Sequence, residues 1–547
     1  MRRLLLRWAI RNGSFLAAAV LAVATVSACG STPVGESAAA ATAKQPRVLL
    51  VGTFSGHAGQ YPTIQAAVNA ARSGDWILVG PGDYHENADT TGPAPEYASS
   101  GGFGGVYIAK SNIHLRGMNR NSVIVDGTKP GTTACSADPS EQNYGRTGTG
   151  GAADGRNGIV VWQANHVSVD NLTVCNFLAG ADPSGNEIWW NGGAESGAVG
   201  LHQYSGSYLT ATSTFSGTDS TNAQYGIFSS NSSGPATWTH TYASNFNDSG
   251  MYVGACLRVC GITIDDAWME YNALGYSGTN SGGAIVIKHS QFDNNQDGLD
   301  TNTQIAGDPP APQDGACPKD AVSPITHTHS CWVFEDNYVH DNNNPNTPAA
   351  GSAAAGPVGT GMTISGGRND TVKNNIFADN GAWGVLFVPY PDSGTPSLVQ
   401  TCAGTGGVQL GSLGCVYDPE GDALLHNTFS HNGFFGNTDN LDFGQITLAA
   451  NQPQNCYAGN NDPDGAAPPD LETLQAKCGA LTSAANTGGA LLGQVLCDTG
   501  FGTCPAGAHY PHSTGVVMQP LPPDLPSMPN PCAHVPANAW CAGGKPI

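Results

Sequence analysis

A short segment of one shape recurs along the middle of the chain, and it constrains the fold more than any other feature. Each copy has an apolar residue at its centre, and the shortest interval between two centres is 23 residues. A fixed period of this length is typical of a repeat protein, so we take 23 residues as one coil and longer intervals as coils with inserted loops. The apolar centres, which serve as anchors of the repeat, are Val174, Phe215, Phe246, Met269, Phe292, Val339, Phe377 and Phe429.

Asparagine follows the anchor by three residues in five copies. Asn tolerates left-handed turn conformations, and its amide can bond the backbone or a neighbouring side chain. One corner residue repeated in every coil is what a solenoid of stacked parallel strands requires. The repeat therefore predicts an all-β solenoid with a ladder of corner residues formed by Asn272, Asn295, Asn342, Asn380 and Asn432.

The start of the repeat region has its own pattern. Apolar residues at helical spacing follow Thr63, Gly74 comes after the last turn, and residues 76–79 are a run of Trp, Ile, Leu and Val. This pattern predicts a short helix that closes one end of the solenoid, followed by a strand.

These features together resemble the right-handed parallel β-helix proteins of the pectate-lyase-like superfamily. The resemblance covers residues 47–450 and rests on the Asn ladder, the 23-residue coil and the entry from Thr63 to Tyr84. It implies a right-handed parallel β-helix with an N-terminal capping helix, disulfide-stapled loop insertions and an irregular C-terminal cap. That superfamily includes lyases, hydrolases, esterases, epimerases and non-catalytic surface proteins, so the resemblance alone does not define an activity.

The first 28 residues have the pattern of a signal peptide, with four arginines before a short apolar stretch. The segment ends in Val26-Ser27-Ala28-Cys29, which resembles a bacterial lipobox and implies lipidation of Cys29. Ordinary cleavage near the same place is the alternative. Residues 29–46 are predicted to be a flexible tether. We therefore expect a protein that is lipid-anchored to the outer face of the bacterial membrane, or secreted.

The cysteines agree with export. There are 15, and assigning Cys29 to lipid leaves 14 that can pair completely. An exported chain favours disulfides over metal binding, although connectivity does not follow from sequence. Pairing of neighbours would give Cys135/Cys175, Cys256/Cys260, Cys317/Cys331, Cys402/Cys415, Cys456/Cys478, Cys497/Cys504 and Cys532/Cys541. Residues 451–547 are rich in Pro and Cys, lack the repeat, and are expected to cap or wrap the last coil.

The charge balance limits the kinds of partner that the chain can bind. With 20 Lys+Arg and 42 Asp+Glu the formal charge is −22, and no basic stripe is present, which argues against nucleic-acid binding. The expected partner is a polysaccharide or a cell-envelope glycan, with membrane contact only through the lipid anchor, and we expect a monomer.

Charged residues recur at fixed offsets from the anchors. Four residues before the anchor the signs alternate through Asp265, Lys288, Glu335 and Lys373. This column predicts either a ladder of ion pairs between coils or an active face with Lys288 as a base. The next position carries His289, a further catalytic candidate. One residue after the anchor lies another column, with Glu270, Asp293 and His340, at a corner that we expect to be exposed.

The segment from Asp293 to Asp300 has two interpretations besides a plain corner. Asp293, Asn295 and Asp297 have the spacing that begins a calcium loop, so calcium is the one cofactor expected. Residues 295–300 also resemble the Asn-Thr-Asp-Gly-x-Asp segment of polygalacturonases, which implies Asp297 as an acid and Asp300 as its partner. The Gly-His-Gly and Arg-Ile-Lys motifs of those enzymes are missing.

Three further residues suggest how substrate would be held. Trp189 and Trp190 are predicted to lie in a Gly/Asn-rich loop over residues 180–197 and either stack on sugar rings or fold onto the core. Arg368 is one of few basic residues that could neutralise the carboxylate of a uronate. The sequence thus predicts a protein that binds a polysaccharide and processes it as a lyase or a hydrolase. The alternative is a non-catalytic envelope scaffold or adhesin.

Overall fold

The computed structural model describes residues 45–87, 104–302, 332–392, 407–410, 414–448, 455–469, 471 and 489–547, except positions 149, 182, 194–198, 255, 257–258, 280, 282 and 368. The chain divides into two units, residues 1–45 and 46–547, and every element below belongs to the second. The signal peptide, Cys29, nearly all of the tether, residues 303–331 and Arg368 lie outside the described residues.

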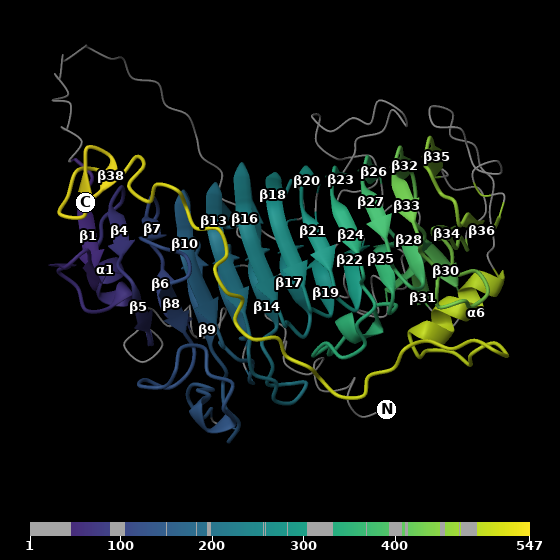
Figure 1. The fold of residues 1–547 in the computed structure, drawn as a ribbon, viewed down its shortest axis with the longest axis horizontal. Coiled ribbons are helices and arrows are strands. Elements are labelled where there is room, and N and C mark those ends of the chain that lie inside the picture. Colours follow the sequence, from purple (N-terminus) through teal and green to yellow (C-terminus); the bar gives the residue numbers. More distant parts are fainter. Residues whose placement is uncertain are drawn as a thin grey trace, which may run out of the picture. The chain divides into compact units, whose positions relative to one another are not determined.

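The strands described within residues 46–471 form a right-handed parallel β-helix, as the repeat predicts (Figure 1). Each coil contributes a strand to each of three faces. The first and second faces belong to one 18-stranded sheet that bends along its middle, and the third face is an 11-stranded sheet.

The first face is made by β1 (Val48–Val51), β4 (Trp76–Val79), β7 (His114–Gly117), β20 (Ile285–Lys288), β23 (Trp332–Glu335), β26 (Thr371–Lys373), β32 (Ala423–Leu425) and β35 (Cys456–Ala458). The second face is made by β5 (Gly82–Tyr84), β8 (Val123–Asp126), β21 (Gln291–Asp293), β24 (Tyr338–His340), β27 (Ile376–Ala378) and β33 (Thr428–Ser430). Four long strands bend across both faces: β10 (Val167–Cys175), β13 (Tyr204–Thr212), β16 (Ala236–Ser244) and β18 (Ile262–Glu270).

The third face is made by β6 (Gly104–Ile108), β9 (Asn157–Trp162), β11 (Asn186–Asn191), β14 (Tyr225–Ser230), β17 (Ser249–Gly254), β19 (Leu274–Ser277), β22 (Asp297–Asn302), β25 (Thr360–Ser365), β28 (Trp383–Val388), β34 (Phe443–Gln445) and β36 (Ala466–Ala467). Small accessory elements are β2 (Thr53–Phe54), β3 (His57–Ala58), β12 (Leu201–His202), β15 (Ser232–Ser233), β29 (Tyr390–Asp392), β30 (Gly407–Leu410), β31 (Gly414–Tyr417), β37 (Cys541–Ala542), β38 (Lys545–Pro546) and the 3-10 turns η1 (Pro139–Glu141) and η3 (Ala353–Ala355).

The predicted Asn ladder joins the second face to the third. Asn295 donates from its Nδ2 to Asn342 Oδ1 at 3.0 Å, and Asn272 Nδ2 donates to Asn295 Oδ1 at 3.1 Å. A second ladder of Asn side chains lies between the first and second faces. It was not predicted, although Asn337, Asn375 and Asn427 lie two residues before an anchor of the repeat. It runs through Asn337, Asn375, Asn427 and Asn460, with Nδ2 to Oδ1 distances of 3.0, 3.0 and 3.1 Å.

The corners between faces turn through left-handed backbone conformations. Asp266, His289 and Asp336 at the first corner have φ of 57°, 49° and 56°, and Asp341 and Asp379 at the second have 53° and 55°. Asn, Asp and His occupy this region more readily than other non-glycine residues, which explains why polar residues recur there.

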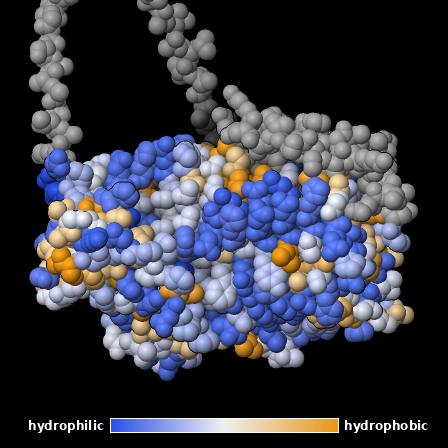
Figure 2. Space-filling view, turned by 45° about the horizontal axis from the view of Figure 1, so that its top comes forward, coloured by the Kyte–Doolittle hydropathy of each residue, from blue (hydrophilic) through white to orange (hydrophobic). Residues whose placement is uncertain are grey.

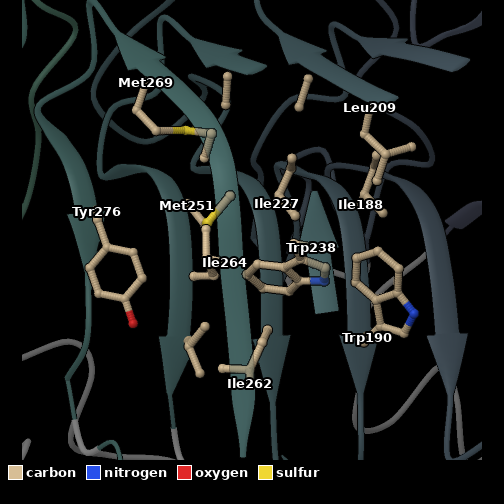
Figure 3. Packing of buried hydrophobic residues seen from close by; sticks show 14 of the residues in the cluster. Ile188, Trp190, Leu209, Ile227, Trp238, Met251, Ile262, Ile264, Met269 and Tyr276 are labelled. Carbon is tan, nitrogen blue, oxygen red and sulfur yellow. The ribbon is translucent and has the colours of Figure 1, made fainter. Parts of the chain in front are cut away.

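The anchors point into the helix and stack between coils. Met269, Phe292, Val339, Phe377 and Phe429 occupy paired positions and are buried. Two earlier anchors were wrong. Val174 pairs with Ala211, and Ala211 with Ala243, so the predicted Phe215 and Phe246 are not in this column. In and beside those coils larger residues at other positions fill the interior, including Trp190, Trp238 and Tyr276 (Figure 3).

The capping helix is α1 (Ile64–Ala70). The Thr63 side chain accepts a hydrogen bond from the Ala66 backbone N–H, as an N-cap residue does. Its apolar side, with Ile64, Ala67 and Val68, belongs to the same buried cluster as the first coils.

The C-terminal region has two parts. Helix α6 (Gly489–Asp498) packs through Leu491 and Val495 against Leu386 of β28 and Ala467 of β36, at the last coils. Residues 511–547, which we call the strap, then run back along the β-helix to its first coils (Figure 1). Trp540 ends this path, buried beside β1 and β4, and donates from Nε1 to His57 O at 2.9 Å.

Hydrogen bonds hold the strap at intervals along its length. Val517 N donates to Asn346 O at 2.9 Å, Gln519 N to Asn245 Oδ1 at 3.0 Å, and Met528 N to Asn171 Oδ1 at 2.8 Å. Closer to the first coils, Arg116 Nη1 donates to Ala533 O at 2.9 Å. The strap therefore covers the earlier coils, and together with α6 it joins the last coils to the first.

Four disulfides involve only described residues, and all four follow the predicted pairing of neighbours: Cys135–Cys175, Cys256–Cys260, Cys497–Cys504 and Cys532–Cys541. The other three predicted pairs include cysteines outside the described residues. Among the helices described, none is long and apolar enough to cross a membrane.

Candidate functional site

Two columns of side chains point outward from the second face. Strand pairing places their members side by side, one per coil, about 4.8 Å apart at the backbone. The Tyr338 column runs through Thr173, Thr210, Tyr242, Trp268, Gln291, Tyr338 and Ile376. The Glu270 column runs through Ser244, Glu270, Asp293, His340 and Ala378.

Glu270 is the carboxyl group with the most distinctive environment on this face. Only 9% of the residue is exposed, and Tyr242 donates from its hydroxyl to Glu270 Oε1 at 2.6 Å. The pKa of Glu270 is raised to about 7: burial is the largest cause, the Tyr242 hydrogen bond lowers the pKa, and the neighbouring Asp293 charge adds to the rise. A carboxyl group with such a pKa carries a proton that it can give up near neutral pH.

Asp293, one coil further on, has a different environment. Trp268 Nε1 and Gln291 Nε2 donate to its Oδ1 at 2.8 and 2.9 Å, and Asn294 Nδ2 donates to its Oδ2 at 2.7 Å. All three partners are N–H donors, which suits an ionised carboxylate. Asp293 is 4% exposed and Glu270 9%, so the expectation that this corner is exposed was wrong for both residues. The two adjacent carboxyl groups differ in their hydrogen-bond partners, a hydroxyl group for Glu270 and three N–H groups for Asp293, and two carboxyl groups in different environments suit an acid–base pair.

An aromatic platform adjoins this pair. Tyr338 is 40% exposed, and its ring stacks on His340 with centroids 3.9 Å apart. In the next coil Ile376 is 46% exposed. Exposed flat rings beside polar groups are well suited to contact the apolar face of a sugar ring.

The alternating column on the first face is a ladder of ion pairs. Lys288 Nζ lies 3.4 Å from Asp265 Oδ2, and Lys373 Nζ lies 2.8 Å from Glu335 Oε2. Strand pairing continues the column back to Arg116 and Asp170, 3.2 Å apart. His289 Nδ1 lies 2.8 Å from Asp265 Oδ1, so both candidates of this face, Lys288 and His289, contact the same carboxylate.

Asp297 and Asp300 lie on a different face from Asp293. Both are in β22, in the third face, and Asp297 is completely buried. Thr363 Oγ1 donates to Asp297 Oδ2 at 2.7 Å. Burial raises the pKa of Asp297 well above its usual range, and Asp300 adds to the rise. The structure thus separates these two carboxyl groups from Lys288, His289 and Asp293.

The predicted calcium ligands do not meet at one point. The Asn295 side chain is engaged within the ladder, donating to Met269 O at 3.0 Å as well as to Asn342. Asp293 accepts from three N–H donors, and Asp297 lies on the third face, so these residues do not fit a bound calcium ion. Elsewhere among the described residues, Asp83, His85 and Asp126 come together near the Cys135–Cys175 disulfide. Both Asp126 oxygens there accept backbone N–H bonds.

The two tryptophans are residues of strand β11 rather than of a loop. Trp190 is fully buried among core residues, and Trp189 is 6% exposed and stacks on Phe228. Neither ring presents a free face to solvent. Of the binding candidates, Arg368 lies outside the described residues.

The carboxyl pair and its platform were only partly visible in the sequence. The column of Glu270, Asp293 and His340 follows from the anchor spacing, but Tyr242 and Tyr338 were not singled out. Tyr338 lies directly before its anchor, and the same offset gives Trp268. Treating the residues directly before the anchors as one column would have identified the Tyr338 platform.

Comparison with known proteins gives likeness in fold only. No protein family matches the sequence, and no curated protein matches it. Among solved structures, the A-module of a mannuronan C-5 epimerase from Azotobacter vinelandii is 14% identical, with a TM-score of 0.42 and coverage of 74% of this chain and 94% of that one. An alginate lyase from Paenibacillus is 12% identical, with a TM-score of 0.36 and coverage of 76% and 95%.

A family 28 exopolygalacturonase from Yersinia enterocolitica is 11% identical, with a TM-score of 0.40 and coverage of 76% and 75%. Such low scores say nothing of what this chain acts on.

Proposed function

We propose that the chain binds a polysaccharide along the outer side of the second face and cleaves its glycosidic bonds. The observation that carries this proposal is the pairing of Glu270 with Asp293, two adjacent carboxyl groups in different environments. Carboxyl groups that cleave glycosides together lie about 5 to 9.5 Å apart. Glu270 and Asp293 are paired residues of β18 and β21, so their backbones lie about 4.8 Å apart and both side chains point outward from the same face.

The chemistry follows from the two environments. Glu270 gives its proton to the glycosidic oxygen while the bond from that oxygen to the anomeric carbon breaks. Asp293 stabilises the positive charge that develops at the carbon. Water then supplies a hydroxyl group to the carbon, and its remaining proton returns to Glu270. The Tyr338 ring, about one coil from Asp293, supports a neighbouring sugar.

An activity screen of the disulfide-intact protein tests this proposal. Polysaccharides are incubated with the protein, and both new reducing ends and unsaturated products are followed. We expect reducing ends without unsaturation, and their loss in Glu270→Gln and Asp293→Asn. Glu335→Gln is the matched control, because it removes a carboxylate of the ion-pair ladder on the first face and leaves the pair intact.

Two results would contradict hydrolysis. Unsaturated products that persist in Glu270→Gln would indicate an eliminating enzyme that uses other groups. Binding of a glycan without any product would favour the non-catalytic scaffold or adhesin predicted as the alternative.

We also propose export and lipid anchoring, which the disulfides support because such bonds persist in oxidising compartments. Mass spectrometry of the mature N-terminus should find lipid on Cys29 in the membrane fraction. Cys29→Ser should lose that lipid. A mature N-terminus without lipid would instead indicate ordinary signal cleavage.

A further inference from the structure

We infer that the glycan carries no carboxylate or sulfate groups, and that this chain selects neutral polysaccharides over polyanionic ones. This inference rests on the proposed function, because it concerns the substrate of the same site. It differs from what the resemblance to pectate-lyase-like proteins suggested, namely a uronate whose carboxylate is neutralised by basic residues.

The charge of the coils that carry the site is strongly negative. We define the open face as the outer surface of β18, β21, β24, β27 and β33, with the adjoining first-face strands and corners. Among the described residues of the open face the basic side chains are Lys288 and Lys373. The acidic ones are Asp265, Asp266, Glu270, Asp293, Glu335, Asp336, Asp341 and Asp379.

Both lysines are already neutralised. Lys288 lies 3.4 Å from an Asp265 oxygen and Lys373 lies 2.8 Å from a Glu335 oxygen. Binding a uronate or a sulfate there would require one of these ion pairs to break. Three further acids are well exposed and contact a histidine ring rather than a lysine or arginine, with side-chain exposures of 62% for Asp266 (beside His240), 51% for Asp341 (beside His340) and 45% for Asp379 (beside His431). A polyanion approaching this face therefore meets like charge without a free cation to bind it.

The arginines near the site do not reduce the negative charge of the open face. Arg120 is 2% exposed, and its guanidinium donates to Thr210 Oγ1, to Leu209 O and to Pro526 O of the strap. Arg116 is 9% exposed and pairs with Asp170. The strap thus covers the two cations that the earlier coils would otherwise present.

What the open face does offer suits neutral sugars. The Tyr338 ring gives a flat apolar surface, and the half-buried amides of Gln291 and Asn294 lie beside Asp293. Amides and carboxylates hydrogen-bond sugar hydroxyl groups. Figure 2 shows a largely hydrophilic surface, with hydrophobic residues only in small scattered patches. Such a surface fits a hydroxyl-rich chain rather than an apolar one.

Matched pairs of polysaccharides test this inference, each pair sharing a backbone and differing in charge. Suitable pairs are hydroxyethyl cellulose with carboxymethyl cellulose, dextran with dextran sulfate, and methyl-esterified with free polygalacturonan. We expect initial rates or affinities at least about tenfold higher for a neutral member at low ionic strength. The ratio of rates or affinities between the two members should fall with added salt, because ions screen the repulsion between the open face and a polyanion.

A charge variant makes the test specific to this face. In Asp266→Asn combined with Asp336→Asn two negative charges disappear, and asparagine tolerates the positive φ of both corners. We expect the preference for the neutral member to fall at least about twofold, because two like charges are gone. Asp219→Asn, on the exposed loop between β13 and β14, is the control and should leave the preference unchanged.

The possible results separate this inference from the proposed function. Faster cleavage of a polyanionic member, abolished by Glu270→Gln, would overturn the preference for neutral glycans and keep the carboxyl pair as the catalyst. Equal rates on both members of each pair would also overturn the inference. Neither binding nor product with any member would overturn the proposed function, and this inference with it.

Discussion

The second face of the β-helix has two halves that share one architecture and differ in what covers them. In the earlier coils the strap lies over the outer side chains, and Thr173, Thr210 and Tyr242 are 3%, 1% and 2% exposed. Further along the same column Tyr338 and Ile376 are 40% and 46% exposed. The pairing along this column continues without a break between the halves.

The structure of the coils is therefore not what distinguishes the halves. Whether the strap covers a coil decides which part of the second face can contact a ligand. Arg116 and Arg120 lie in the covered half and are bonded to the strap. Glu270 and Asp293 lie where the covered half ends, and the platform of Tyr338 follows. The strap therefore restricts the candidate site to the later coils.

The largest effect should come from the end of the strap. Trp540 is fully buried with Leu50, Trp76 and Leu78, in the first coils. We expect Trp540→Ala to lower the free energy of unfolding by about 4 kcal/mol, because it leaves a large cavity. Denaturant titration measures the loss. Phe501→Ala, which removes a ring that is 75% exposed, is the control. A loss below about 1 kcal/mol would mean that the strap is not firmly docked.

Two ion pairs of the first-face ladder allow the halves to be compared directly. The side chains of Arg116 and Asp170 are 11% and 6% exposed, and those of Lys288 and Asp265 are 31% and 32% exposed. Arg116→Met should destabilise the protein by about 3 kcal/mol, because it leaves Asp170 buried without its partner. Lys288→Met should cost about 0.5 kcal/mol or less. Similar losses in the two variants would show that coverage does not distinguish the halves.

The pH dependence should report Glu270. Because Glu270 must carry a proton to act as an acid, kcat/KM should fall as the pH rises through about 7. The folded pKa lies above the unfolded value of 4.5, so the contribution of Glu270 to stability is full below 4.5 and is lost as the pH rises through about 7.

Tyr242→Phe tests the assignment of that titration. It removes a hydrogen bond that lowers the pKa of Glu270, so the alkaline fall in kcat/KM should move to higher pH. Tyr225→Phe, which loses a tyrosine hydroxyl near Asp248 on the third face, should not move it. An unshifted profile in Tyr242→Phe would assign the titration to another group.

The smallest effect on stability belongs to the open half. Tyr338→Ala should change the free energy of unfolding by no more than about 0.5 kcal/mol, since the ring is 40% exposed. It should weaken glycan binding about tenfold, which corresponds to about 1.4 kcal/mol. Calorimetry on the folded variant separates the two quantities. A large loss of stability with unchanged binding would make Tyr338 a structural residue.

The fold followed from the sequence wherever one residue type recurs at a fixed offset. The Asn ladder and the later anchors were predicted because every coil needs the same corner and the same interior contact. The two wrong anchors arose because Ala211 and Ala243 occupy the position, and a nearby Phe attracted the assignment. In those coils the volume is supplied by residues of other columns, such as Trp238 on the same strand as Ala243, which the anchor column does not reveal.

The site was less predictable, for two physical reasons. The environment of Glu270 depends on Tyr242, 28 residues earlier, whose position becomes clear only once the strand register is known. The strap has no period, and its contacts join residues hundreds of positions apart, so no local pattern marks them. Trp189 and Trp190 were misplaced in a loop because the Gly and Asn residues around them outweighed a short strand pattern.

A stack of coils in which each touches only its neighbours can melt progressively from either end. Here the backbone carbonyl of His57 accepts a hydrogen bond from Trp540, 483 residues away in sequence. The terminal coils thus cannot fray one at a time unless this closure opens first. Docking of the strap requires the first coils to be in place. The closed chain should consequently unfold in one cooperative step and resist proteases that act on frayed ends.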